Sequence, residues 1–269
     1  MKHLSLLEKL AAILLRDLLT AMRYRAAFWI LALTMILEIA GDYYLARAVG
    51  SGFQPEGFDY YPFLLIGTSA YTVFLAGINS FVSTIRNAQV TGTLEVLMTT
   101  STSGPTIVLL SAVSAFVGIT VHMALYLAVG LALFRVKLQS PNLLGCAVII
   151  LISVTVAIAI GILGAALQVL TQKGGAIVWL SGAVGWLFTG IMFPVTALPK
   201  PLQAIAVLIP VKYSLDGLRL ALLRGASFPE LAPSLGVLTA FGFVLLPLSL
   251  IFFSYAVRRA RLQGTLSFY

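Results

Sequence analysis

The chain is poor in charge and in the side chains that perform chemistry. Only 10% of its 269 residues are charged, two are histidine and one, Cys146, is cysteine. Soluble domains carry about 25% charged residues, so a chain that is 60% hydrophobic with a mean hydropathy of +1.02 cannot cover its apolar surface in water. One cysteine excludes a disulfide within the chain. The composition predicts an all-α integral membrane protein with almost no room for a separate soluble domain.

The sequence also lacks the motifs of nucleotide, metal and hydrolase sites. It contains no G-x-x-x-x-G-K-[ST] loop, no H-E-x-x-H, no Cys/His cluster and no G-x-S-x-G. His122 has no carboxylate nearby in sequence, and we interpret it as a hydrogen-bonding residue that faces the interior of the bundle. We expect no catalytic residue, no metal and no cofactor in this chain, which is not an enzyme by itself. The net charge of +8 is attributed to membrane-flanking cations and not to nucleic acid.

Six apolar segments are long enough to cross a membrane, which takes about 20 residues. They are expected at 26–45, 61–82, within 106–134, within 142–170, at 176–194 and at 235–257. An even number places both ends on one side. Cations are concentrated before the first span and in the basic tail, 258–269, which places both termini in the cytoplasm and the 26–257 domain in the cytoplasmic (inner) cell membrane. Four cations between Lys200 and Arg224 on the outer side weaken this orientation without reversing it.

Residues 1–25 form an amphipathic pattern and not a span. Lys2, Lys9, Arg16 and Arg23 recur every seven residues, a spacing that drifts only ~20° per step around a helix. The four cations therefore form one stripe. We predict a helix that lies in the membrane interface with this stripe toward anionic headgroups; the alternative is a helix packed on a partner protein.

The outer segment, 196–230, is apolar but repeatedly broken by proline. Its marker residues are Pro194, Pro199, Pro210, Tyr213, Asp216 and Arg219. Each piece is too short to span, so we expect two short re-entrant helices that pack on the bundle, the alternative being an ordinary surface loop. Asp216 and Arg219 are three residues apart, a spacing at which they are expected to pair on one helix face.

Two acids lie four residues apart on one face of the first span. Asp42 is expected near the outer interface and Glu38 deeper in the membrane. An intramembrane carboxylate is costly and usually faces a polar cavity or a partner. We interpret both as contacts of a translocation path or of a helix–helix lock, or else as acids that reach the interface.

A polar segment, 86–101, separates the second and third spans. Its residues Gly92-Thr93-Leu94-Glu95-Val96-Leu97, preceded by Arg86, resemble the cytoplasmic G-T-L-E-x-L signature of ABC-2 type transporter permeases. The later Phe193-Pro194, Leu198-Pro199 and 210–219 resemble the outer F-P…L-P…P-x-x-Y-x-x-D-x-x-R pattern of the same family. The two motifs stand in register with six spans over nearly the whole chain.

This resemblance implies a mechanism for the polar segment. Members of the family pair two six-span permeases, here a second copy or a related chain, and bind two separate ATPase subunits that hold ATP and Mg. The segment would supply a short coupling helix to an ATPase groove. Thr91 or Thr93 could cap it, Glu95 would offer a charge, and the remaining contact residues are Gly92, Leu94, Val96, Leu97 and Met98.

The favoured function is the permease subunit of an ATP-driven exporter that moves a drug, lipid, glycolipid or polysaccharide. The alternative is an ion-coupled secondary transporter or channel that uses Glu38, Asp42 and His122. Tyrosines at the outer ends of the first two spans, among them Tyr43 and Tyr61, are interpreted as an interface belt or as an aromatic lining. Gly161, Gly164, Gly182 and Gly185 permit close helix approach.

Overall fold

A computed structural model provides the structure of the protein. It describes residues 25–90, 104–136, 138, 140–171 and 173–263, with Glu8, Ala11, Leu15 and Leu19 before them. The interfacial cation stripe (Lys2, Lys9, Arg16 and Arg23) and most of the coupling segment (91–101) lie outside these residues, so both remain predictions.

The described part of the chain is helical and contains no strand, which confirms the all-α prediction. The long helices are α2 (Arg25–Val49), α3 (Tyr60–Val90), α5 (Gly104–Leu133), α6 (Leu143–Thr171) and α10 (Phe228–Gln263). The shorter ones are α7 (Gly174–Phe188), α8 (Lys200–Ala206) and α9 (Pro210–Leu223), with 3₁₀ turns η1 (Pro55–Gly57) and η2 (Val195–Ala197).

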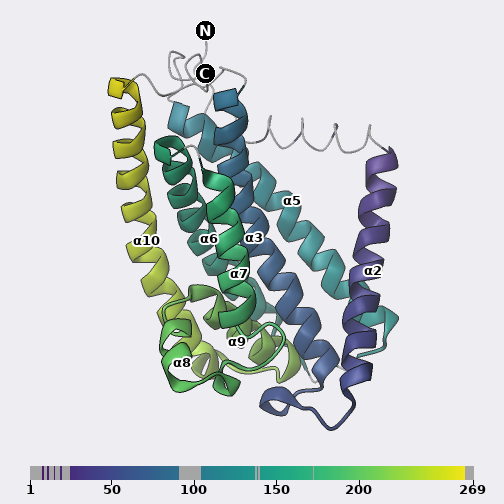
Figure 1. Cartoon of the computed structure of the whole chain (residues 1–269). Coiled ribbons are helices and arrows are strands. Elements are labelled where there is room, and N and C mark those ends of the chain that lie inside the picture. The colour runs from purple at the N-terminus through teal and green to yellow at the C-terminus, as the bar shows by residue number, and fades with distance from the viewer. Residues whose placement is uncertain are drawn as a thin grey trace.

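Helices α2, α3, α5, α6 and α7 alternate in direction between the upper and lower ends of Figure 1, and α10 runs upward like α6. The ends of α3 and α10 lie together at the upper end of Figure 1, and α8 and α9 lie at the lower end. Four described helices are long and apolar enough to cross a membrane: Trp29–Val49, Tyr60–Val90, Leu143–Thr171 and Phe228–Gln263. Two shorter apolar stretches, Val117–Leu133 and Val178–Phe188, add to them. The chain is a multi-pass membrane protein, and the count of six spans remains a prediction.

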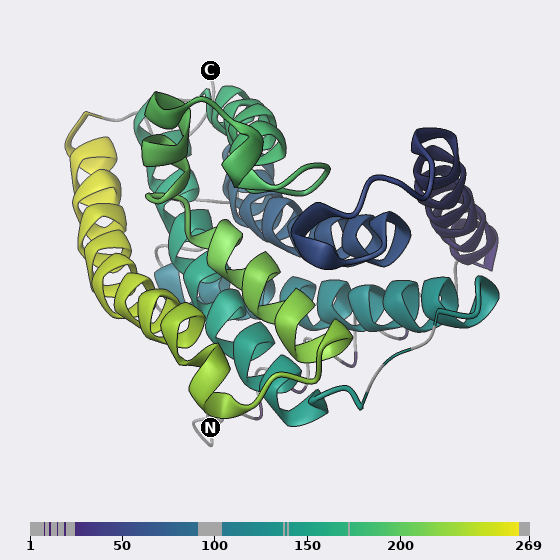
Figure 2. The same ribbon diagram turned by 90° about the horizontal axis from the view of Figure 1, so that it is seen from below.

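Helix α3 forms the centre of the bundle, packed on α5, α6, α7 and α9. Helix α2 packs on α3 and α5 and stands at the margin in Figure 2. Its large apolar side chains, such as Trp29 at 70% exposure, face outward to whatever surrounds the protein. In water such a face would be an aggregation liability, whereas lipid or a partner permease covers it at no cost.

Small residues allow α3 and α6 to approach closely. A Cβ atom on Gly161 would lie 2.5 Å from Cδ2 of Phe81, and one on Gly164 would lie 3.0 Å from Cγ2 of Val82. On α7, Gly185 packs against the Tyr71 ring in the same way. These glycines therefore pack helices within one chain, which leaves them unavailable as a contact stripe for a second subunit.

Two helices end at other residues than the expected spans. The second span was expected to end at residue 82, yet α3 continues to Val90 and carries Arg86 as an exposed residue near its end. No glycine or proline interrupts 82–90, and Arg and Gln are good helix formers, so nothing stops the helix there. At 1.5 Å per residue α3 is about 46 Å long, well beyond the ~30 Å hydrocarbon core.

The fifth span was expected at 176–194, but α7 ends at Phe188. Gly190 adopts a φ of +81°, a left-handed conformation that suits glycine and cannot continue a helix. The 15-residue helix is about 22 Å long, so it does not cross a full hydrocarbon core. Irregular backbone follows it, and its polar groups need partners inside the protein.

Candidate coupling and translocation site

The upper end of α3 is fixed by a polar contact with α6. Nε2 of Gln168 donates a hydrogen bond to Oε1 of Gln89 at 2.8 Å, and both side chains are buried. The Nε2 donor of Gln89 is itself buried without an acceptor in the structure. Val90 is the last residue of α3, and the expected coupling segment continues directly from residue 91. The segment is thus attached directly to the central helix of the bundle.

Asp42 joins three helices. Its Oδ2 accepts hydrogen bonds from Oγ1 of Thr68 at 2.7 Å and from the hydroxyl of Tyr126 at 3.0 Å, so α2 is bound to α3 and α5. Tyr126 is only 4% exposed. The contact corresponds to the helix–helix lock among the expected roles of this acid, and its place in a translocation path remains a proposal.

Replacing Asp42 by leucine is expected to lower the free energy of unfolding by about 1–3 kcal/mol, because the buried Tyr126 hydroxyl loses its acceptor. Asp42→Asn keeps an acceptor oxygen and should cost less than about 1 kcal/mol. Thermal unfolding of the detergent-purified protein measures both. Equal losses of stability in the two variants would show that the shape of the side chain, and not its hydrogen bond, holds α2 in place.

Glu38 lies one turn deeper in α2 and is exposed at the margin of the bundle. With His122, Ser69 and Thr72 it lines a small cavity of about 10 Å³, close to the space that one water molecule needs. The structure thus brings Glu38 and His122 to one place. Half-buried His122 faces this cavity between helices, in keeping with its expected position toward the interior.

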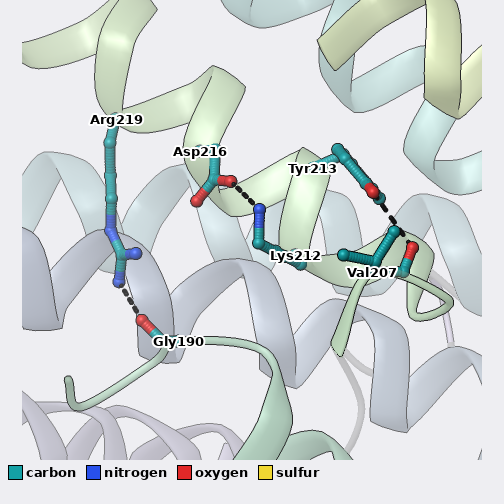
Figure 3. Close-up of polar contacts among 6 residues, drawn as sticks. All are labelled: Gly190, Val207, Lys212, Tyr213, Asp216 and Arg219. Atoms are coloured by element: carbon teal, nitrogen blue, oxygen red, sulfur yellow. Dashed lines mark hydrogen bonds and ion pairs between the residues drawn. The ribbon is translucent and has the colours of Figure 1, made fainter. Parts of the chain in front are cut away.

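At the lower end, proline begins each short element. Pro194 precedes η2 and accepts a hydrogen bond from Ala197 N at 2.9 Å. Pro199 precedes α8 and Pro210 is the first residue of α9, where the missing N–H costs nothing and the fixed φ suits a helix. The hydroxyl of Tyr213 donates to the Val207 carbonyl at 3.0 Å and joins α9 to the end of α8 (Figure 3). Two short helices lie where a pair was expected.

Arg219 is the most deeply buried cation among the described residues, with a side chain only 1% exposed. Its Nε and Nη2 donate to the Phe63 carbonyl at 3.3 and 3.1 Å, and Nη2 also donates to the carbonyls of Gly190 at 2.9 Å and Ile191 at 3.2 Å. The guanidinium also lies 3.3 Å from the centre of the Phe63 ring. It therefore satisfies the irregular backbone that follows α7 and joins it to the start of α3.

The expected pair between Asp216 and Arg219 is wrong. Oδ2 of Asp216 accepts from Nζ of Lys212 at 2.9 Å, one turn back along α9, while Arg219 extends away toward Gly190 (Figure 3). The i, i+3 spacing permits a surface pair worth a few tenths of a kcal/mol. Three carbonyls within reach of the buried guanidinium offer Arg219 more, because hydrogen bonds to a charged donor are each worth about 1.5–3 kcal/mol.

Close approach at this contact depends on Gly67 of α3. A Cβ atom there would lie 2.7 Å from Nη2 of Arg219 and 2.9 Å from the Ile191 carbonyl. Burial lowers the pKa of Arg219 to about 10, while nearby Asp216 and Glu56 oppose the shift, so the group is charged at neutral pH. Sequence reasoning identified Arg219 as a site residue but missed its partners, which lie 28, 29 and 156 residues away.

The tyrosines at the lower end are mostly packed inside the protein. The ring of Tyr43 stacks on Phe134 with centroids 3.8 Å apart, and Tyr61 meets both rings edge-on. The hydroxyl of Tyr61 donates to the Gly130 carbonyl at 2.9 Å. Tyr44, 63% exposed, matches the expected interface belt, whereas Tyr43 and Tyr61 join α2, α3 and α5.

The bundle of long apolar helices defines a multi-pass membrane protein, in which a G-T-L-E sequence follows α3 and prolines begin the short helices α8 and α9. The profile of the ABC-2 type transporter family matches residues 8–223, which includes the described helices from α2 to α9. The chain belongs to the ABC-2 type transporter family and is a transmembrane permease. No curated protein matches the chain.

Proposed function

We propose that the chain is the membrane subunit of an ATP-driven exporter. In the working complex, two permeases, this chain with a second copy or a related one, form the path through the cytoplasmic membrane. Two separate ATPase subunits bind ATP and Mg on the cytoplasmic face, where both termini of the permease lie. The ATPases drive the cycle through the 91–98 segment.

The observation that carries this proposal is the family match over residues 8–223, joined to the position of the G-T-L-E motif. The motif begins two residues after α3, a helix that packs on α2, α5, α6, α7 and α9. Leu94, Val96 and Leu97 supply apolar contact area and Glu95 a charge for a basic residue of an ATPase. The Gln89–Gln168 contact ties this end of α3 to α6, so a force on the motif reaches two helices.

A hydrophobic or amphipathic cargo suits the chemistry of the spans. Between Trp29 and Val49 the apolar helix carries only Glu38, Asp42 and Arg47 as charged residues. A path for small ions requires a series of polar or charged sites across the membrane. Drugs, lipids, glycolipids and lipid-linked polysaccharides are the cargo classes that the proposal covers, with release into the outer leaflet or beyond it.

The test is reconstitution of the permease with the ATPase subunits that co-purify with it. Glu95→Ala and Leu97→Ala are each expected to weaken ATPase binding about tenfold or more, as the loss of an interface anchor does, and to reduce cargo-stimulated ATP hydrolysis in proportion. Glu56→Ala and Leu144→Ala are the matched controls, because both residues are exposed at the opposite end of the bundle. The proposal fails if both motif variants transport cargo at the wild-type rate.

The ion-coupled alternative would use Glu38, Asp42 and His122 as titrating groups. Asp42 already accepts two hydrogen bonds that join α2 to α3 and α5, so releasing it would loosen the bundle. Transport in vesicles that persists without ATP and stops when the proton gradient is dissipated would favour this alternative over the exporter.

A further inference from the structure

Two adjoining cavities lie at the lower end of the bundle, the larger between the α2–α3 connection and the α5–α6 connection and the smaller between α2 and the start of α3. Their volumes are about 580 and 430 Å³, within the range of ligand sites. Asp59 and Tyr61 line both, so they form one recess, named here the lower recess. The interactions described above leave this recess open.

Three arginines line the lower recess: Arg135 and Arg224 in the larger cavity and Arg47 in the smaller. Asp59 is the only acid among the lining residues of either cavity. Neither Arg47 nor Arg135 is paired with a carboxylate of the described residues. The recess therefore holds an excess of positive charge, with planar donors that match phosphate geometry.

Arg224 is held in position while most of its donors stay available. Its Nη2 donates to the Glu56 carbonyl at 2.8 Å, and the guanidinium lies 4.6 Å from the centre of the Phe58 ring. A guanidinium has five N–H donors. One direct hydrogen bond leaves the other N–H donors of Arg224 free to bind an anion. Because the Phe58 ring already restricts the guanidinium, little conformational freedom is lost when an anion binds.

Arg135 occupies a backbone position that favours glycine. Its φ is +51°, and the N–H groups of Arg135 and Val136 donate to the carbonyls of Ala132 and Leu131 in the pattern that ends a helix with a left-handed residue. An arginine there is strained by about 1 kcal/mol or more relative to glycine. Glycine would suit this backbone conformation better, so local folding does not favour arginine at position 135. Binding of a ligand in the recess would favour it.

The walls of the recess are rigid and aromatic. Tyr61 and Phe134 belong to the stacked cluster with Tyr43, which fixes the lining before any ligand arrives. Exposed Tyr44, whose ring centre lies 5.5 Å from that of Tyr43, is the kind of aromatic residue that lies at the headgroup level of a membrane. Cations, amphipathic rings and this depth together fit the headgroup of an amphiphile.

We propose that the lower recess binds the net-anionic, phosphate-bearing headgroup of an amphiphile. Arg135 and Arg224 bind the phosphate oxygens, and Arg47 adds positive charge at the entrance beside Tyr43. Asp59 repels the phosphate and so lowers the affinity of the recess for it. The site faces the outer leaflet in the proposed orientation, but its affinity does not depend on ATP-driven export.

Equilibrium binding to the full-length protein in a neutral detergent tests the proposal, with short-chain phosphatidylglycerol and phosphatidylcholine as probes. The wild type is expected to bind phosphatidylglycerol about tenfold more tightly than phosphatidylcholine, and Arg135→Gln/Arg224→Gln should remove this preference. Arg258→Gln/Arg261→Gln, which changes the same charge at exposed positions near the end of α10, should retain it. Unchanged selectivity in the first double variant, or equal binding of the two lipids by the wild type, overturns the proposal.

Two further variants keep the test valid if the glutamine pair does not fold. Asp59→Asn removes the repelling charge and keeps a side chain that can cap α3, so phosphatidylglycerol should bind more tightly. Arg135→Lys/Arg224→Lys keeps the charge and should retain part of the preference. Weaker binding by Asp59→Asn contradicts the proposal.

Inorganic phosphate identifies the source of the group. If it displaces phosphatidylglycerol at a similar concentration, the recess binds phosphate alone; if it does not, the recess binds the headgroup together with its chains. If the wild type binds phosphatidylglycerol but shows no ATP-driven transport, the exporter proposal fails and the proposal for the lower recess stands.

Discussion

Arg219→Met is expected to lower the free energy of unfolding by about 3 kcal/mol or more, the largest effect of any single substitution in the lower half of the bundle. Methionine has a similar length and keeps the apolar packing, but it leaves the carbonyls of Phe63, Gly190 and Ile191 buried without the guanidinium. The stability of Arg219→Lys should lie between those of the wild type and Arg219→Met, because one ammonium cannot reproduce the planar geometry that reaches all three carbonyls. Thermal unfolding in detergent gives the order.

A second measurement separates this local role from a general loss of stability. Limited proteolysis should cut Arg219→Met first in the irregular stretch after α7, between Gly190 and Pro199, because that backbone has lost its donor. Arg258→Met, at an exposed position on α10, should show neither the lowered stability nor the new cleavage. If Arg219→Met melts with the wild type, the guanidinium does not hold this backbone.

Gly161→Leu is expected to cost about 3 kcal/mol and to separate α3 from α6. Its first added carbon would lie 2.5 Å from the Phe81 ring, which is itself only 1% exposed and cannot move aside. Gly161→Ala should show a smaller loss, because the clash at Cβ is offset by about 1 kcal/mol of helix propensity. Unfolding in detergent and the yield of monodisperse protein report both changes.

The matched control for this position is Gly236→Leu on α10. A Cβ atom there meets nothing within 4 Å, so leucine should be neutral or stabilise the helix slightly. If Gly161→Leu and Gly236→Leu unfold alike, α3 and α6 do not pack as closely as the structure has them.

Hydropathy predicted the helical class and the positions of the long helices, because about 20 apolar residues are a length requirement that the sequence states directly. The prolines likewise predicted where the short outer helices begin, since proline acts on its own backbone. Pro199 and Pro210 stand at the starts of α8 and α9 for this reason.

Partners distant in the sequence could not be predicted in this way. The Asp42 contact needs Thr68 and Tyr126, 26 and 84 residues away, and no local pattern pairs them. The spacing of Asp216 and Arg219 suggested a local pair, whereas tertiary structure offered Arg219 three buried carbonyls. The end of α7 at Phe188 could not be predicted for the same reason. The backbone that follows it accepts hydrogen bonds from the Arg219 side chain of α9.

Helix α3 is one uninterrupted rod, and its two ends meet different parts of the proposed machine. Near its first residue, the Phe63 carbonyl accepts a hydrogen bond from the Arg219 guanidinium, and after its last residue the chain continues into the proposed coupling segment. In the proposed complex, a helix this long would carry a displacement of one end to the other and would pivot at the close contact of Phe81 with Gly161. Closure of the ATPases would then pull directly on the bond between α3 and the outer helices, and no relay of intermediate residues would be needed.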